Sequence, residues 1–74
     1  MITIASLQIG ETGIILEESL SKIPLKLLEM GCLPGAEVTL LQKAPFKDPL
    51  YICVGESHLA IRYETANEIL ISKE

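Results

Sequence analysis

Apolar and polar residues alternate along most of this 74-residue chain, which is the spacing of short β-strands with one buried face. Val38 and Leu40, for example, share one side of their segment, while Glu37 lies on the other side. A similar alternation over residues 2–4 predicts an extended segment before the first strand. The pattern as a whole predicts strands over residues 14–16, 37–43, 50–54, 58–62 and 69–71.

One segment has a helical period instead. An apolar stripe recurs there at helical spacing and consists of Leu20, Ile23, Leu27 and Met30. Ser19 and Ser21 are both suitable N-caps, and Pro24 suits a first turn, where a missing N–H donor does no harm. These signals predict one short helix from about Ser21 to Met30.

Turn signals separate these elements. Gly31 stands where a left-handed C-terminal cap is needed, and Pro34 with Gly35 fits a type II turn. Residues 55–57 predict a hairpin turn, and residues 64–67 predict a short helical turn before the last strand. About five short strands with one short helix predict a mainly β fold, a small SH3-like barrel whose closure would remove unpaired sheet edges.

Composition limits what this fold can contain. A chain of 74 residues needs its apolar residues for one core, so residues 1–74 are expected to form a single domain without a separate catalytic layer. The apolar content is 49% but the aromatic content is only 4%, so the core is expected to consist of Ile, Leu and Val.

Charge and hydropathy exclude several classes of function. Ten acidic and six basic residues are scattered along the chain and give a net charge of −4, with no basic stripe for nucleic acid. No apolar run approaches the roughly 20 residues of a membrane helix, and the N-terminus does not resemble a secretion signal. We therefore expect a soluble cytoplasmic protein that binds no nucleic acid and does not insert into a membrane. In that compartment Cys32 and Cys53 are expected to stay reduced and to act as small apolar residues.

The segment Ala44-Pro45-Phe46-Lys47-Asp48-Pro49 is the best candidate for a functional surface. Its two prolines stiffen the backbone and predict an ordered loop between two strands. One interpretation is that this loop presents the Phe46 ring and the Asp48 carboxylate to a partner at little ordering cost. The other is that Phe46 folds back onto the barrel and Asp48 makes a local turn hydrogen bond.

Chemically reactive constellations are sparse. Cys53, Glu56 and His58 lie around one predicted hairpin, with Cys53 and His58 on the same strand face, and are the only cluster of metal-ligating residue types. We expect them not to form a tight metal site, because such a site needs three or four suitable ligands and a second shell. A single His with no acid or nucleophile at a recognisable spacing also makes no catalytic triad, which predicts that the protein is not an enzyme.

Three motifs resemble the FeoA family of small proteins that accompany the FeoB ferrous iron transporter. They are K-L-L-E-M-G-x-L-P-G from Lys26, A-P-x-x-D-P from Ala44, and L-A-I-R from Leu59 to Arg62. The resemblance spans residues 7–71 and implies an SH3-like fold, a cytoplasmic location and an accessory role beside FeoB, whose N-terminal domain hydrolyses GTP. It also implies an association with ferrous iron at the level of the family, although no cofactor is expected for this chain.

The resemblance, together with the loop chemistry, suggests a set of residues for contact with the transporter by a monomeric protein. These candidates are Lys26, Pro45, Phe46, Asp48, Pro49 and Arg62. Arginine is common in the family where Lys26 stands, although an ion pair with Glu29 is the simplest role for Lys26. Lys47 replaces the usual family glycine, which predicts a changed turn type and adds a positive charge.

An alternative follows from a second resemblance, to the C-terminal domains of iron-dependent repressors of the DtxR type. In that case the chain would be a metal-responsive or general protein-interaction domain acting with a separate DNA-binding chain. The neighbouring gene distinguishes the two hypotheses, because a polytopic membrane protein with a GTPase domain supports the first and a helix-turn-helix protein the second.

Overall fold

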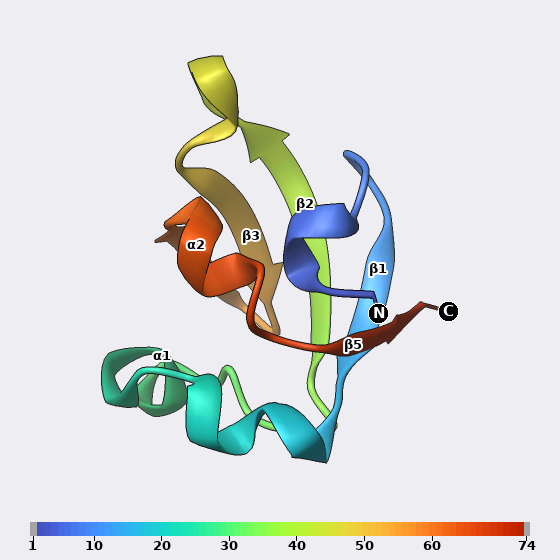
Figure 1. Cartoon of the computed structure of the whole chain (residues 1–74), viewed down its shortest axis with the longest axis vertical. Helices are drawn as coiled ribbons and strands as arrows, with labels where there is room; N and C mark the ends of the chain where they lie inside the picture. Colours follow the sequence, from blue (N-terminus) through green and yellow to red (C-terminus); the bar gives the residue numbers. More distant parts are fainter. Residues whose placement is uncertain (1, 74) are drawn as a thin grey trace.

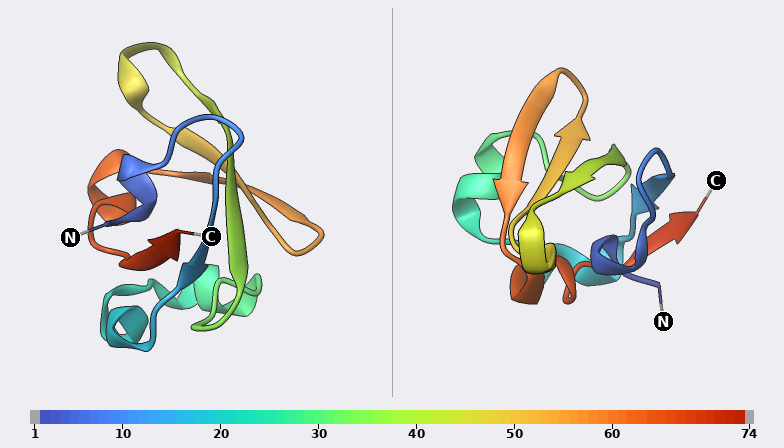
Figure 2. Two further views of the ribbon diagram at one scale, coloured as in Figure 1. Left: turned by 90° about the vertical axis from the view of Figure 1, so that its right-hand side faces the viewer. Right: turned by 90° about the horizontal axis from the view of Figure 1, so that it is seen from above.

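The computed structural model describes residues 2–73 and shows one five-stranded antiparallel sheet with short helices (Figure 1). The strands are β1 (Thr12–Ile15), β2 (Glu37–Lys43), β3 (Leu50–Val54), β4 (Ser57–Ile61) and β5 (Ile71–Lys73). They are ordered β4-β3-β2-β1-β5, and the sheet is strongly twisted when seen from the side and from above (Figure 2). The predicted mainly β, SH3-like class is confirmed.

The expectation that closure removes free sheet edges is wrong in one respect. Within residues 2–73, β4 and β5 occupy the two ends of the strand order and do not pair with each other. The centre of the sheet is β2, which pairs with β1 through residues 37–39 and with β3 along most of its length. The register with β3 shifts between Leu40 and Gln42, an irregularity of the kind that bends a strand.

The helical segment differs from the prediction. Instead of one helix over residues 21–30, a 3₁₀ helix η2 (Glu17–Lys22) is followed by the short helix α1 (Leu25–Glu29). The break has a local cause, since a residue before proline is forced out of the helical region, and Ile23 has an extended backbone with ψ 119°. Pro24 itself is extended and precedes α1 as its N-cap.

The predicted apolar stripe is only half buried as a result. Ile23 lies in the core and Leu27 packs against it, but Leu20 and Met30 are exposed. The predicted caps are also wrong, because neither η2 nor α1 has a side-chain cap hydrogen bond. The segment from η2 to the end of α1 therefore leaves apolar side chains on the surface.

Both ends of the described chain differ from the prediction. The extended segment expected at residues 2–4 is limited to Thr3, which bridges to Leu70, and a 3₁₀ helix η1 (Ile4–Ser6) follows. The last strand was expected over residues 69–71 but lies at Ile71–Lys73. The reason is that Ile69 O accepts a hydrogen bond from the Ile4 N–H, so this residue pairs with the N-terminal segment and not with β1.

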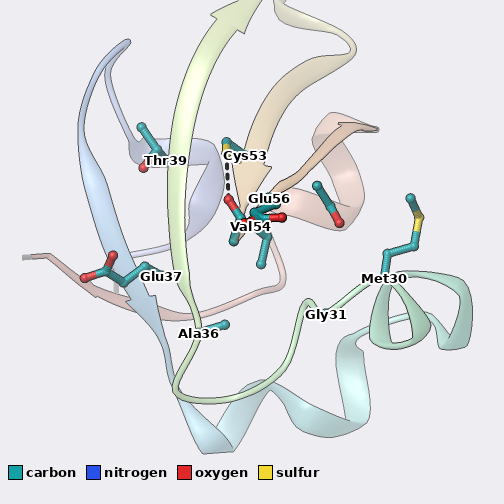
Figure 3. Close-up of a pocket in the computed structure, with 10 residues that line it drawn as sticks. Met30, Gly31, Ala36, Glu37, Thr39, Cys53, Val54 and Glu56 are labelled. Atoms are coloured by element: carbon teal, nitrogen blue, oxygen red, sulfur yellow. Dashed lines mark hydrogen bonds between the residues drawn. The ribbon is translucent and has the colours of Figure 1, made fainter.

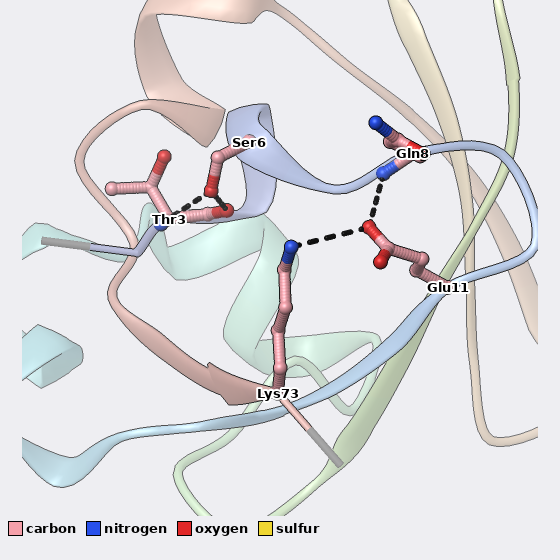
Figure 4. Close-up of polar contacts among 5 residues, drawn as sticks. All are labelled: Thr3, Ser6, Gln8, Glu11 and Lys73. Carbon is pink, nitrogen blue, oxygen red and sulfur yellow. Dashed lines mark hydrogen bonds and ion pairs between the residues drawn. The ribbon is translucent and has the colours of Figure 1, made fainter.

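Polar contacts hold these ends together (Figure 4). Ser6 Oγ donates to Thr3 O at 2.6 Å and accepts from the Thr3 N–H at 3.0 Å. Glu11 accepts a hydrogen bond from the Gln8 N–H and pairs with the Lys73 ammonium at 3.4 Å. The hydrogen bond from Gln8, helped by Lys73, lowers the pKa of Glu11 below its usual value of 4.5.

The core is aliphatic, as the composition predicted. Its buried members are Ile4, Leu7, Ile15, Ile23, Cys32, Val38, Leu40, Leu50, Ile52, Val54, Leu59, Ile61, Ala66, Ile69 and Ile71. Phe46, Tyr51 and Tyr63 are all exposed. The predicted helical turn near residues 64–67 is the short helix α2 (Tyr63–Ala66), which packs beside η1.

The turn after α1 agrees with the sequence. Gly31 has φ 97° and Gly35 has φ 92°, both in the left-handed region that only glycine enters freely. The Ala36 N–H donates to Leu33 O at 2.9 Å across Pro34 and Gly35, which closes the predicted turn.

Replacing Gly35 by valine should destabilise the protein by about 1–3 kcal/mol, because a β-branched residue is strained at positive φ. Nothing lies within 4 Å of the position that a Cβ would occupy, so the cost arises from the backbone alone. Gly35→Asn is the control and should lose less, since asparagine tolerates this region. Chemical denaturation measures both, and equal midpoints for Gly35→Val and the parent would show that the turn assignment is wrong.

Ser19 has a structural role that we did not predict. It is fully buried, donates through Oγ to Leu70 O at 3.1 Å, and accepts from the Leu70 N–H at 2.6 Å. Ser19→Ala should cost about 1–3 kcal/mol, because it leaves the Leu70 N–H without a partner. Ser21→Ala is the matched control, since Ser21 is exposed. Thermal unfolding of both variants is the test, and equal melting temperatures would contradict the proposed role.

Candidate functional site

The structure separates the predicted partner-binding residues into two groups. The loop between β2 and β3, which carries residues 45–49, projects at one end of the longest axis, and α1 with Lys26 lies toward the other end (Figure 1). Arg62 belongs to the first group because it contacts Asp48. The sequence alone had placed all of these residues in one set.

The β2–β3 loop is an ordered turn, as the prolines predicted. The Ala44 N–H donates to Pro49 O at 3.0 Å, and the Lys47 N–H donates to Ala44 O at 2.8 Å. A 3₁₀ turn, η3 (Pro45–Lys47), forms its tip. Phe46 and Lys47 both have positive φ, 65° and 63°, which is a strained conformation for residues other than glycine. Lys47 therefore adopts a backbone conformation that the glycine usual in the family would reach at lower cost.

Phe46 is the most exposed large apolar residue of the described chain. Its exposed fraction is 100%, so the interpretation in which it folds back onto the barrel is wrong. An aromatic ring held away from the core by a strained, hydrogen-bonded loop gains nothing from intramolecular burial. Contact of Phe46 with another molecule stays a prediction.

Asp48 fixes the base of this loop. Its Oδ1 accepts a hydrogen bond from the Tyr63 N–H at 3.0 Å and lies 3.6 Å from Arg62 Nε. The hydrogen bond is not the local turn bond considered from the sequence, because Tyr63 follows fifteen residues later, at the start of α2. The sequence did not indicate Tyr63 as the partner, because every residue except proline has a backbone N–H and the residue type does not show which one Asp48 will bind.

Lys26 lies beside a groove between α1 and β4. This groove of about 290 Å³ is lined by Lys26, Leu27, Met30, His58, Leu59 and Ala60. The predicted ion pair of Lys26 with Glu29 is wrong, since the ion pairs within residues 2–73 are Lys22–Glu68, Arg62–Asp48 and Lys73–Glu11. Within residues 2–73, Lys26 thus lines the groove without an ion-pair partner.

The three candidate metal-ligating residues lie near the β3–β4 hairpin. Cys53 and His58 are directly opposite each other in the register of the two strands. The Cys53 thiol donates to Gly55 O at 3.3 Å, and Glu56 is at the turn (Figure 3). Within residues 2–73 no group of three or more His, Cys, Asp or Glu side chains is placed to hold a metal ion.

The hollow beside this hairpin measures about 540 Å³ and is partly polar (Figure 3). It is lined by Met30, Gly31, Ala36, Glu37, Thr39, Cys53, Val54, Gly55, Glu56 and Ser57.

Both cysteines are free thiols, and burial raises the pKa of Cys32, which keeps that thiol protonated and unreactive. In the part of the chain that the structure describes, no helix is long and apolar enough to cross a membrane.

The fold agrees with known structures of small SH3-like proteins. An iron uptake regulatory protein, FeoA, is 27% identical with a TM-score of 0.77, covering 99% of this chain and 96% of that one. Iron(II) transport protein A from Clostridium thermocellum is 29% identical with a TM-score of 0.80, covering 97% and 45%. FeoA from Stenotrophomonas maltophilia, crystallised with zinc and described as a prokaryotic SH3 domain protein, is 23% identical with a TM-score of 0.78, covering 100% and 96%.

The SH3-like class is shared with proteins of another kind. A manganese-dependent transcriptional repressor has a TM-score of 0.78 at 11% identity, covering 99% of this chain and 36% of that one, which shows a common fold only. No curated protein sequence is similar enough to count as a match. The family model of the FeoA domain, however, matches residues 2–73. The chain belongs to the FeoA family and is a non-catalytic accessory protein, as the sequence motifs predicted.

Asp48→Ala should loosen the loop without unfolding the sheet, because it removes the acceptor of the Tyr63 N–H. We expect faster hydrogen exchange at the Tyr63 and Lys47 amides, measured by NMR. Arg62→Gln is the matched control, since it removes only the exposed ion pair and should have little effect. Unchanged exchange in Asp48→Ala would mean that this carboxylate does not anchor the loop.

Proposed function

We propose that residues 1–74 act as a single, monomeric FeoA domain in the cytoplasm, as an accessory protein of ferrous iron uptake that contacts a FeoB-type GTPase transporter. The observation that carries the proposal is the match of the FeoA family model to residues 2–73. Two similar structures support it, since one is an iron uptake regulatory protein and the other an iron(II) transport protein. The iron is cargo of the transporter, and the accessory protein requires no cofactor of its own.

The first surface for this contact is the β2–β3 loop. Phe46 is fully exposed, Pro45 and Pro49 stiffen the backbone on either side, and Asp48 ties the loop to α2. Such a loop loses little conformational freedom when it binds, and an exposed aromatic anchor is typical of an interface hot spot. Arg62 and Lys47 add positive charge at its rim, which favours a contact that weakens at high salt.

Lys26 belongs to a second surface. Because the longest dimension of the chain is 29 Å and the loop and α1 lie toward opposite ends of it, one small patch cannot contain both. Loop contact therefore does not depend on Lys26, and the two surfaces can be tested separately.

The repressor-type alternative rests on the shared fold alone. In residues 2–73 the longest helix has six residues, and it is a 3₁₀ helix, so these residues contain no helix of the kind that reads a DNA groove. The type of protein that the neighbouring gene encodes, a membrane protein with a GTPase domain or a helix-turn-helix protein, still distinguishes this alternative from the transporter hypothesis.

Deletion of the gene should reduce ferrous iron uptake without changing transporter abundance, and Phe46→Ala should reproduce this defect. Phe46→Ala is preferred to a change at Asp48, because Phe46 makes no buried contact and its loss leaves the fold intact. Uptake of radioactive ferrous iron and a pull-down of the transporter are the measurements.

Ile9→Ala is the matched control, because Ile9 is another exposed apolar residue, in the loop before β1, with an exposed fraction of 63%. It should support normal uptake. Normal uptake and transporter capture by Phe46→Ala would show that the loop is not the contact, whereas a deletion without effect on uptake would contradict the proposed function itself.

A further inference from the structure

The β4 strand leaves a row of backbone groups without partners at the edge of the sheet. Val54 and Ser57 flank a two-residue hairpin turn and face each other in the register. In such a hairpin this pair is hydrogen bonded, and bonded and non-bonded pairs alternate from there. The Cys53–His58 and Tyr51–Ala60 pairs are then the non-bonded ones. His58 and Ala60 consequently direct their N–H and C=O groups away from β3.

These outward groups are open to another molecule. β4 is the last strand in the order of the sheet, and His58 and Ala60 are both exposed. Within residues 2–73, no backbone hydrogen bond outside the β3–β4 ladder involves either residue.

This edge also lacks the features that normally prevent strand addition. Proteins protect sheet edges with lysine, proline, bulges or a covering element. β4 reads Ser-His-Leu-Ala-Ile, and its register with β3 is continuous. The opposite edge, β5, carries Lys73 and lies beside the N-terminal segment through the bond from the Ile71 N–H to Ile2 O. Only β4 is thus left both unprotected and exposed.

Apolar hollows lie on the two sides of β4. The groove toward α1, of about 290 Å³, contains Leu27, Met30 and Leu59, with Lys26 at its rim. A second hollow of about 390 Å³, toward β3, includes Leu41 and Tyr51, and the two share residues 58–60. An added strand points successive side chains alternately to the two sides, so both hollows can receive side chains from one extended segment.

We infer that β4 binds an extended peptide segment of a partner protein as an additional strand, with an apolar side chain in the α1 groove and a carboxylate beside Lys26. The inference rests on the proposed function only in assigning this segment to the cytoplasmic part of the transporter. The loop contact described above and this edge are separate surfaces.

Charge favours a foreign acidic segment over a second copy of this chain. A copy paired through its own β4 brings Ser57 to Ile61, which include no carboxylate to meet Lys26. The Lys26 ammonium is therefore left unmatched in a dimer and matched by an acidic peptide.

The first experiment titrates the isotope-labelled full chain with a probe peptide followed by NMR. The probe has eight residues, alternating threonine and valine with one central glutamate, and both ends are blocked. We expect chemical shift changes at residues 58–60, at α1 and at the residues that line the second hollow, such as Leu41 and Tyr51. Shifts confined to the β2–β3 loop, or no shifts at millimolar peptide, would overturn the inference.

Ala60→Pro is the decisive variant, because proline removes an outward N–H that the β3–β4 ladder does not use. It should weaken probe binding by about tenfold or more, whereas the matched control Ala60→Val, which keeps the N–H, should bind within about twofold of the parent. Equal binding by all three proteins would overturn strand addition.

Lys26→Glu provides a test that does not depend on how Ala60→Pro folds. This variant should prefer a probe in which lysine replaces the central glutamate, reversing the preference of the parent. An unchanged preference would overturn the assignment of the carboxylate to Lys26.

A pull-down of the transporter separates this inference from the proposed function. Capture by the parent and loss in Ala60→Pro supports both, and equal capture by the two proteins overturns the role of β4 while the proposed function stands. No capture by the parent contradicts the proposed function, and the probe titration then still decides whether β4 binds peptides. Sedimentation that shows the parent dimerising through β4, with Ala60→Pro monomeric, would make a second copy the occupant and overturn the inference.

Discussion

The pairing of the last strand, β5, with the first, β1, is the interaction on which the rest of the structure depends. β5 pairs with β1, and a Cβ at Gly13 would lie only 2.6 Å from the Ile71 side chain, so these strands approach as closely as they do because position 13 has no side chain. Beside this pair of strands, the seam of the fold, the Ser19 hydroxyl makes two hydrogen bonds with the backbone of Leu70, the residue before β5. Without this seam the aliphatic core would be open on one side, and a core so small has no second layer to compensate.

The two proposed contact surfaces lie away from this seam and differ in their chemistry. The β2–β3 loop presents a fully exposed aromatic ring on a strained backbone that Asp48 ties to the start of α2. The β4 edge presents backbone hydrogen-bonding groups beside an apolar groove. Neither surface depends on a reactive side chain, which agrees with a non-catalytic protein whose proposed role is to bind a partner. Strain and unpaired backbone groups both lower stability, and the fold tolerates them only at its periphery.

The shared architecture with transcriptional repressors shows how little the fold alone says about function. The FeoA family model and the iron uptake proteins of similar sequence distinguish this chain from the repressors, whose chains are much longer. What such domains share is the fold. The surface residues of this chain are those of its own sequence, and within residues 2–73 they include a fully exposed phenylalanine and a lysine that lines a groove.

The sequence by itself determined the three strands β2, β3 and β4, the aliphatic core and the turn at Gly35, because period-two alternation, composition and positive φ are local properties that each residue carries. It misplaced the first and last strands, which were expected at residues 14–16 and 69–71. It also carried the family motifs. The break at Pro24 was local too, and proline geometry could have revealed it. Only the tertiary structure decided that Ser19 binds Leu70, that Asp48 accepts from Tyr63, and that Lys26 lies far from the loop. The first two contacts each join a side chain to a backbone group many residues away, and all three arrangements exist only once the sheet has brought distant segments together.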